Sequence, residues 1–323
     1  MFDRADLEAA ARTIYAHMPP TPQIAWPLLA QRFGCTVVVK HENHTPAGAF
    51  KIRGGIVYVE RLKRERPQVR GIVSATRGNH GQSLAFAGRA FCVPVVIAVP
   101  HGNSVEKNAA MRAFGAELIE TGQDFDEARA AAKDIAHERG YEFVSSFGAD
   151  LVTGVATYAL ELFQAFADLD TVYVSIGLGS GICGLIRTRD LLGLKTEIVG
   201  VVSENAAAYA LSFEAGRVIG TNSARTFADG MAVRVPDGEA LEIIRKGAAR
   251  ILRVSDDAVA QAMRVCHEDT HNMAEGAGAA PLAGLAQERA SMQGRKAGVI
   301  LCGGNIDRAW MAQVLAGGTP AVS

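Results

Sequence analysis

The sequence has few cysteines, and their arrangement suits neither a metal site nor a disulfide framework. The five cysteines are odd in number and scattered, and no pair has the CxxC spacing typical of zinc modules. Disulfide-rich secreted domains and zinc modules are therefore excluded as classes, and a reducing, cytoplasmic location is expected. The cysteines occupy positions 35, 92, 183, 266 and 302.

An excess of one charge and a long apolar run are also missing. The formal net charge is −1, so no basic surface for nucleic acid or for an anionic membrane is expected. The longest uncharged, apolar-looking stretch, residues 171–186, is short and interrupted by glycines, which argues against a membrane span. Residues 1–8 include early acids and have no apolar core of the signal-peptide type. We therefore expect neither a membrane nor a nucleic acid as a partner.

What is present is the composition and periodicity of a two-domain α/β protein. The chain has 323 residues, of which 49% are hydrophobic and 21% charged, as in ordinary globular proteins. Short β-branched runs alternate with helical patterns, and this alternation predicts parallel sheets covered by helices on both faces. Strands are predicted at 36–39, 71–74, 94–99, 116–119, 172–176, 197–201 and 298–301, and helices at 81–91, 105–114 and 124–139.

A lysine flanked by apolar and small residues stands out in the segment 46–55. Phe50 and Ile52 neighbour Lys51, and the nearby glycines leave space for a flat ligand. A desolvated setting favours the free amine, the form in which lysine is a covalent catalyst. Taken alone, the segment favours a solvated lysine at the start of an amphipathic helix, since lysine is seldom buried.

Three further segments follow strands and are rich in glycine or small polar residues. Residues 175–184 can cradle a phosphate, because glycines allow close approach and helix-start amides supply donors. A dinucleotide fingerprint is the rival interpretation, but Ile182 stands where its third glycine belongs.

Residues 74–83 offer donors to a carboxylate, or Thr76 or Asn79 simply caps a helix. Residues 302–307 form a strand-to-helix turn in which Cys302 lacks an evident histidine partner.

Six segments, taken in order, resemble those of the fold-type II pyridoxal-phosphate enzymes, in the serine/threonine dehydratase and serine racemase branch. The resemblance spans about residues 21–307. It implies two open, mostly parallel twisted sheets with flanking helices and an active site in the cleft between two domains. The expected large domain comprises residues 1–70 and 149–323, and the small domain residues 71–148. The six segments are 50–54, 78–81, 177–181, 228–230, 275–278 and 303–305.

The resemblance also implies roles for individual residues. Lys51 bonds covalently to pyridoxal 5'-phosphate and moves the substrate Cα proton, while Phe50 packs beside the cofactor ring. Cys302 lies next to the pyridine nitrogen. Further cofactor contacts are expected from Asn79, from the phosphate loop Gly177, Leu178, Gly179, Ser180 and Gly181, and from Gly230 and Glu275. The substrate carboxylate is expected to meet Thr76, Arg77, Gly78, Asn79 and His80.

The sequence departs from that family pattern at several positions. The racemase branch uses a serine where this chain has Arg77, and a guanidinium is a poor proton shuttle. Arg77 instead suggests a substrate with a second carboxylate, such as 3-hydroxyaspartate, because it can pair bidentately. Val202 and Ala208 replace the cation-binding carboxylates of some relatives, so no metal site is expected.

These inferences together predict a dehydratase that acts on a 3-hydroxy amino acid of the threonine, serine, 3-hydroxyaspartate or phenylserine type. It would release a 2-oxo acid and ammonia. A catabolic role in the cytoplasm is expected, and the resemblance implies a homodimer, which is common in this family. The alternatives are an amino-acid racemase, a β-replacement synthase, a nicotinamide-dependent oxidoreductase using residues 177–181, and a non-catalytic binding protein.

Overall fold

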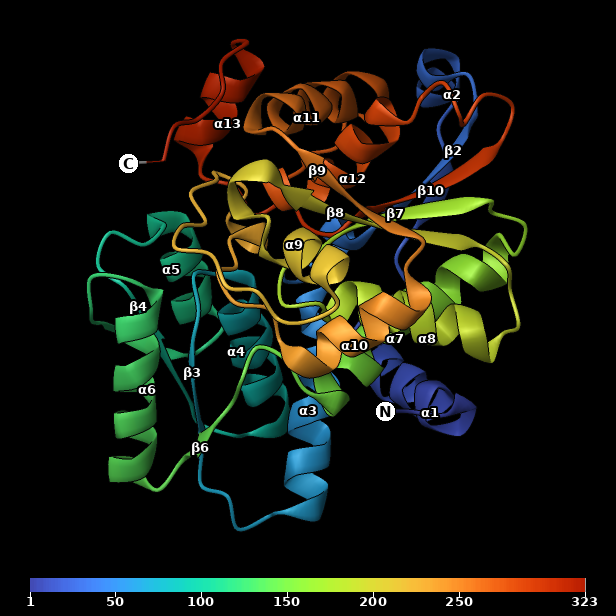
Figure 1. The fold of residues 1–323 in the computed structure, drawn as a ribbon. Helices are drawn as coiled ribbons and strands as arrows, with labels where there is room; N and C mark the ends of the chain where they lie inside the picture. The colour runs from blue at the N-terminus through green and yellow to red at the C-terminus, as the bar shows by residue number, and fades with distance from the viewer. Residues whose placement is uncertain (323) are drawn as a thin grey trace. The chain divides into compact units, whose positions relative to one another are not determined.

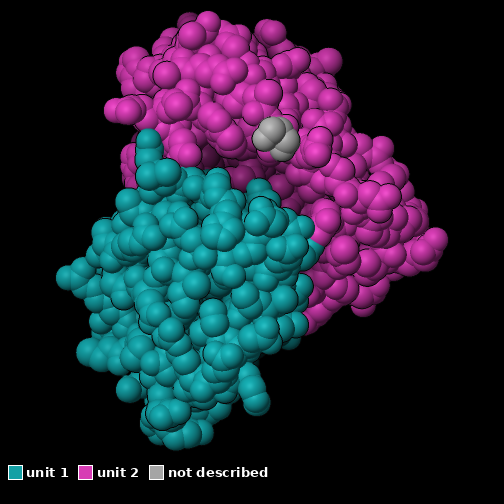
Figure 2. Space-filling model, turned by 90° about the vertical axis from the view of Figure 1, so that its left-hand side faces the viewer, with its two compact units in different colours: residues 1–19, 45–157 teal, residues 20–44, 158–323 magenta. Residues whose placement is uncertain are grey.

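The computed structural model describes residues 1–322 (Figure 1), and the chain divides into two compact units (Figure 2). Unit 1 comprises residues 1–19 and 45–157, and unit 2 comprises residues 20–44 and 158–323. The predicted small domain, 71–148, lies wholly inside unit 1, which also takes in residues 45–70. In residues 1–322, no helix combines the length and the apolar character needed to cross a membrane.

Unit 1 is built on a four-stranded parallel sheet with the order β5-β4-β3-β6. Its helices are α1, α3, α4, α5 and α6, together with the first half of α7. The elements are α1 Arg4–Tyr15, α3 Lys51–Glu65, β3 Ile72–Ala75, α4 Asn79–Phe91, β4 Val95–Val99, α5 Val105–Ala113, β5 Glu117–Glu120, α6 Phe125–Arg139, β6 Glu142–Phe143 and α7 Ala149–Ala165.

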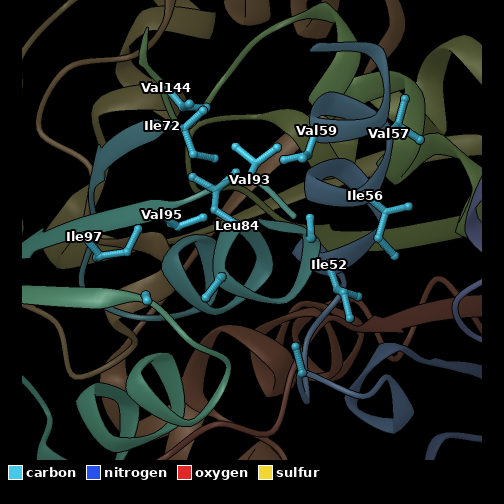
Figure 3. Close-up of a cluster of buried hydrophobic side chains, with 14 of the residues drawn as sticks. Ile52, Ile56, Val57, Val59, Ile72, Leu84, Val93, Val95, Ile97 and Val144 are labelled. Carbon is cyan, nitrogen blue, oxygen red and sulfur yellow. The ribbon is translucent and has the colours of Figure 1, made fainter. Parts of the chain in front are cut away.

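The two central strands of unit 1, β3 and β4, are buried on both faces because their apolar side chains alternate between two hydrophobic clusters. Ile72 and Val95 point into one cluster, whereas Val73 and Val96 point into the other, beneath α6. Figure 3 shows the first cluster, which combines Ile52, Ile56, Val57 and Val59 of α3 with side chains of β3 and β4. This packing places α3 in unit 1, so the unit begins earlier in the chain than the predicted small domain.

Unit 2 is built on a six-stranded sheet with the order β1-β2-β10-β7-β8-β9. Only β1 is antiparallel, and it forms one edge. The predicted fold class is therefore confirmed. The strands are β1 Gln23–Ala25, β2 Thr36–His41, β7 Thr171–Ser175, β8 Glu197–Ser203, β9 Arg250–Val254 and β10 Lys296–Leu301. The helices are α2 Pro27–Phe33, α8 Ser180–Leu191, α9 Ala208–Ala215, α10 Gly238–Gly247, α11 Asp256–Thr270, α12 Gly276–Gln287 and α13 Arg308–Leu315. Short 3-10 turns lie at Glu42–His44, Glu204–Ala206 and Asp229–Met231.

Each sheet contains a point where the strand order reverses. In unit 1, the chain runs outward from β3 through β4 to β5 and then returns to the other side of β3 with β6. In unit 2, it runs from β7 through β8 to β9 and returns beside β7 with β10. Ligands of open α/β sheets bind beyond the carboxyl ends of the strands at such switch points. The loops at these points are 76–78 after β3, 176–179 after β7 and 302–307 after β10.

Candidate cofactor and substrate site

Lys51 is the first residue of α3, and a closed turn fixes the chain before it. The hydroxyl of Thr45 accepts a 2.9 Å hydrogen bond from the amide of Ala49 and donates one of 2.9 Å to its carbonyl. Gly48 has a φ of 65°, the left-handed region that favours glycine. The Lys51 Nζ lies 4.6 Å from the centre of the Phe50 ring, within the range of a cation–π contact. Phe50 and Lys51 thus contact each other at the start of α3.

Two glycines let α3 pack closely against its neighbours. A Cβ at Gly54 would lie 2.7 Å from the main-chain oxygen of Leu151 on α7, and one at Gly55 would lie 2.3 Å from Ser83 Oγ on α4. Ser83 Oγ in turn donates a 2.5 Å hydrogen bond to the carbonyl of Lys51. The helix that carries the lysine is therefore held against α4 by contacts that only a glycine at position 55 permits.

The predicted carboxylate loop, residues 76–80, follows β3 at the switch point of unit 1. Neither Thr76 nor Asn79 caps α4, contrary to the capping alternative. The N-cap is Gly78, which makes no side-chain capping hydrogen bond, and Thr76 Oγ1 accepts a 3.0 Å hydrogen bond from the Gly78 amide. In residues 1–322 the amide of His80 donates to no other group. The start of α4 thus keeps a donor and a favourable dipole for an anion.

His80 is buried beside Lys51 and is uncharged. Burial, and secondarily the positive charge of Lys51, lower the pKa of His80 to about 3. Its Nε2 has no hydrogen-bond partner within residues 1–322. Buried polar atoms of this kind normally have partners, so this nitrogen fits a site that receives a ligand. Arg77, three residues earlier, is exposed and forms no ion pair or hydrogen bond with any other residue that the structure describes.

In unit 2, the glycine loop 177–181 has the features of an anion cradle. It joins β7 to α8, and its backbone N–H groups donate to no other group within residues 1–322. Gly179 has a φ of 104°, which disfavours any other residue. A Cβ at Gly177 would lie 2.4 Å from the carbonyl oxygen of Gly230. Free amides at a helix start fit a phosphate, so the loop suits a phosphorylated cofactor.

The remaining predicted cofactor residues lie in the same unit and are linked by close contacts. A Cβ at Gly230 would lie 2.8 Å from that of Ala277, and one at Gly278 would lie 2.3 Å from the carbonyl oxygen of Gly303. The buried Glu275 is the N-cap of α12, and its amide donates a 3.1 Å hydrogen bond to the Gly303 carbonyl. Segments 177–181, 228–230, 275–278 and 303–305 therefore converge.

Cys302 lies directly after β10 and is buried. Its sulfur accepts a 3.5 Å hydrogen bond from the hydroxyl of Ser175, at the end of the neighbouring strand β7. Both residues are neutral polar groups at the switch point of unit 2.

The predicted site residues therefore form two groups, one in each unit. Phe50, Lys51 and residues 76–80 belong to unit 1, and residues 177–181, Gly230, Glu275 and Cys302 belong to unit 2. Val202 and Ala208 are buried apolar residues, and no cluster of three or more metal-ligating side chains occurs in residues 1–322.

Several side chains that shape these groups carry no signal in the sequence. Thr45 and Ser83 fix the main chain around Lys51. Tyr158 and Tyr209 each donate a 2.8 Å hydrogen bond to a carbonyl of the glycine loop, at Gly181 and Leu178 respectively. These residues lie outside the six segments, and only the folded chain brings them to the site.

Comparison with known proteins places this arrangement in a family. The family model described as pyridoxal-phosphate-dependent enzyme matches residues 14–303. An L-threonine ammonia-lyase of Geobacter sulfurreducens is 35% identical over 279 residues, which cover 86% of this chain and 69% of that protein. An L-threo-3-hydroxyaspartate ammonia-lyase of Saccharomyces cerevisiae is 28% identical over 313 residues, covering 97% and 96% of the two chains.

Solved structures agree with these relatives. The crystal structure of a threonine deaminase from T.th. superposes with a TM-score of 0.89 at 28% sequence identity, covering 95% of this chain and 99% of that one. Racemases are also among the structural neighbours. With a family model matching most of its length, this chain belongs to the pyridoxal-phosphate-dependent enzymes.

Proposed function

We propose that this protein is an ammonia-lyase that removes the 3-hydroxyl group of an amino acid as water and then releases ammonia, leaving a 2-oxo acid. The observation that carries the proposal is a lysine, Lys51, at the start of a helix beside the anion-binding start of α4, in a chain of this family. The two ammonia-lyase relatives support the reaction class.

The proposal assigns Lys51 to covalent attachment of pyridoxal 5'-phosphate and to proton transfer at the substrate Cα. When bound, the cofactor withdraws electrons from Cα and so acidifies its proton. The amides of loop 177–181 hold the phosphate, Phe50 packs on the ring, and Asn79, Gly230, Glu275 and Cys302 complete the contacts. Loop 76–80 orients the substrate carboxylate through its helix-start amides.

The roles proposed for His80 and Cys302 depend on each side chain being uncharged. The His80 imidazole is neutral at physiological pH, because its pKa is about 3. It therefore adds no positive charge beside Lys51 and leaves an unpartnered nitrogen for a donor on the substrate. The neutral Cys302 accepts a hydrogen bond from Ser175 and brings no charge to the pyridine ring.

For the substrate, we propose a 3-hydroxy amino acid with a second carboxylate, of the 3-hydroxyaspartate type. Arg77 supports this choice, because it belongs to the carboxylate loop, is exposed, and is not engaged by another residue of the described chain. The relative from Saccharomyces cerevisiae, which covers this chain almost end to end, is named for that substrate. Threonine, serine and phenylserine are the competing substrates.

Product analysis tests the function. The purified protein, supplied with pyridoxal 5'-phosphate and a 3-hydroxy amino acid, should release equimolar 2-oxo acid and ammonia. Formation of the D-amino acid without ammonia would instead identify a racemase. Borohydride should fix the cofactor to the peptide that contains Lys51, and Lys51→Ala should abolish both this adduct and the reaction. An adduct on another lysine would refute the assignment.

We also propose that the protein is a cytoplasmic homodimer with a catabolic role. None of the five cysteines forms a disulfide within residues 1–322, which suits a reducing compartment. The release of ammonia from an amino acid suits catabolism. Light scattering on the eluted holoenzyme tests the dimer, and a monomeric mass would refute it.

A further inference from the structure

Two buried tyrosines on different helices donate hydrogen bonds to the main chain of the glycine loop 177–181. Tyr158, near the middle of α7, donates a 2.8 Å hydrogen bond to the carbonyl of Gly181. Tyr209, on α9, donates one of 2.8 Å to the carbonyl of Leu178. Their exposed fractions are 0% and 1%, so neither bond competes with bulk water. The two carbonyls lie near opposite ends of the loop.

The Tyr209 hydroxyl is itself fixed from a second side. It accepts a 3.1 Å hydrogen bond from the amide of Asp237, whose side chain caps α10 through the amide of Ala240 at 3.0 Å. Ala240 also faces the loop, since a Cβ at Gly179 would lie 2.8 Å from its methyl group. Burial raises the pKa of Tyr209 above its usual range, which keeps the hydroxyl protonated and able to donate.

The carbonyl and N–H of one peptide unit are rigidly coplanar and point in opposite directions. A hydrogen bond that holds the Leu178 carbonyl toward Tyr209 therefore turns the Gly179 N–H away from it. The Gly181 carbonyl, held by Tyr158, orients the N–H of Ile182, the next residue of α8, in the same way. The backbone N–H groups of loop 177–181 and that of Ile182 donate to no other group within residues 1–322, so they remain available to a ligand.

We propose that Tyr209 and Tyr158 are positioning residues, which set the glycine loop so that its N–H groups point at the cofactor phosphate. This inference rests on the proposed function, in which loop 177–181 holds that phosphate. The tyrosines do not touch the cofactor in this scheme. They act through the main chain, by supplying partners for its carbonyls.

The test compares two ligands that differ only in the phosphate. The full-length chain is freed of cofactor and titrated with pyridoxal 5'-phosphate and with pyridoxal, and the dissociation constants are measured by protein fluorescence. Tyr209→Phe should weaken binding of the phosphorylated ligand by about tenfold, the effect of one lost hydrogen bond and its stranded carbonyl, and should change pyridoxal binding less than about twofold. Tyr158→Phe should act in the same direction.

The matched control is Tyr173→Phe. Tyr173 is also buried, and its hydroxyl donates a 2.7 Å hydrogen bond to Glu288, which is not part of the loop. Tyr173→Phe should leave the ratio of the dissociation constants for pyridoxal 5'-phosphate and pyridoxal unchanged. Circular dichroism identifies any variant that fails to fold. If Tyr209→Phe does not fold, the test is made with Tyr158→Phe alone.

The outcomes separate this inference from the proposed function. If the unaltered protein binds pyridoxal as tightly as its phosphate, the loop holds no phosphate and the proposed function fails. If it prefers the phosphate and both tyrosine variants keep the full preference, only the present inference is overturned. An equal loss for both ligands would also overturn it, because the effect would not pass through the phosphate.

Discussion

The hydroxyl of Ser83 on α4 donates a 2.5 Å hydrogen bond to the main-chain carbonyl of Lys51 on α3. This hydrogen bond joins the first residue of α3 to the second turn of α4. This contact between the helices needs a hydroxyl at position 83 and no side chain at position 55. A Cβ at position 55 would lie 2.3 Å from Ser83 Oγ and 2.8 Å from the Ser83 carbonyl oxygen.

Gly55→Ala should therefore destabilise the protein by roughly 1–3 kcal/mol, the usual cost of overpacking, because the added methyl meets main-chain as well as side-chain atoms. Urea unfolding measures the loss. Gly148→Ala, at a position with no atom within 4 Å of a Cβ, is the matched control and should change stability by less than about 0.5 kcal/mol. Equal stability of the two variants would contradict the packing argument.

A buried ion pair in unit 2 provides a second prediction. Lys40 Nζ lies 2.5 Å from Glu161 Oε2, and the two side chains are 0% and 5% exposed. Lys40→Met leaves a buried carboxylate without its charged partner and should cost about 3–5 kcal/mol. Arg4→Ala, which breaks an exposed pair with Glu8, should cost less than about 1 kcal/mol. Calorimetry measures the loss of stability in both variants. Similar losses for Lys40→Met and Arg4→Ala would mean that the buried ion pair is not formed.

Two buried histidines predict how stability depends on pH. Burial, followed by the neighbouring His44, lowers the pKa of His41 to about 4, and the pKa of His80 is about 3. Lys40 acts on His41 in the same direction as His44, and a hydrogen bond with Asn43 opposes them. In the unfolded chain a histidine has a pKa of about 6.5.

Below pH 6.5 the unfolded chain therefore binds protons that the folded chain does not. Stability should be complete above this pH and decline as the pH falls toward 4, by at most about 1.4 kcal/mol per pH unit for each histidine. A variant with both residues replaced by glutamine should show a shallower decline. The exposed His101 is the control, and His101→Gln should leave the slope unchanged. An unchanged slope in the double variant would contradict the assignment.

The substrate proposal predicts a selective effect of Arg77. Arg77→Ala should lower kcat/KM for 3-hydroxyaspartate by about 30-fold, or about 2 kcal/mol, because a charge pair with the second carboxylate is lost. The value for threonine should change far less, since threonine has no second carboxylate. Arg89→Ala, an exposed arginine at the other end of α4, is the control. Equal losses on both substrates would remove Arg77 from substrate selection.

Local patterns predicted most of the strands. Every strand expected from a β-branched run is present within two residues of its predicted ends, and α6 matches the helix predicted at 124–139, with Asp124 as its N-cap. β1 and β6 were not predicted, because runs of three and two residues carry no recognisable periodicity. β9 was also not predicted, since its arginines at 250 and 253 interrupt the apolar pattern.

Local sequence was enough to establish that glycine-rich loops follow strands and to mark Lys51 as a residue at a helix start. Those features depend on residues that are neighbours in the chain, where propensity and steric freedom act directly. Folding was needed to bring these loops to the two strand-order reversals and to place Ser83, Tyr158 and Tyr209 against their main chains. Hydrogen bonds between residues far apart depend on how helices pack, and they leave no periodic trace in the sequence.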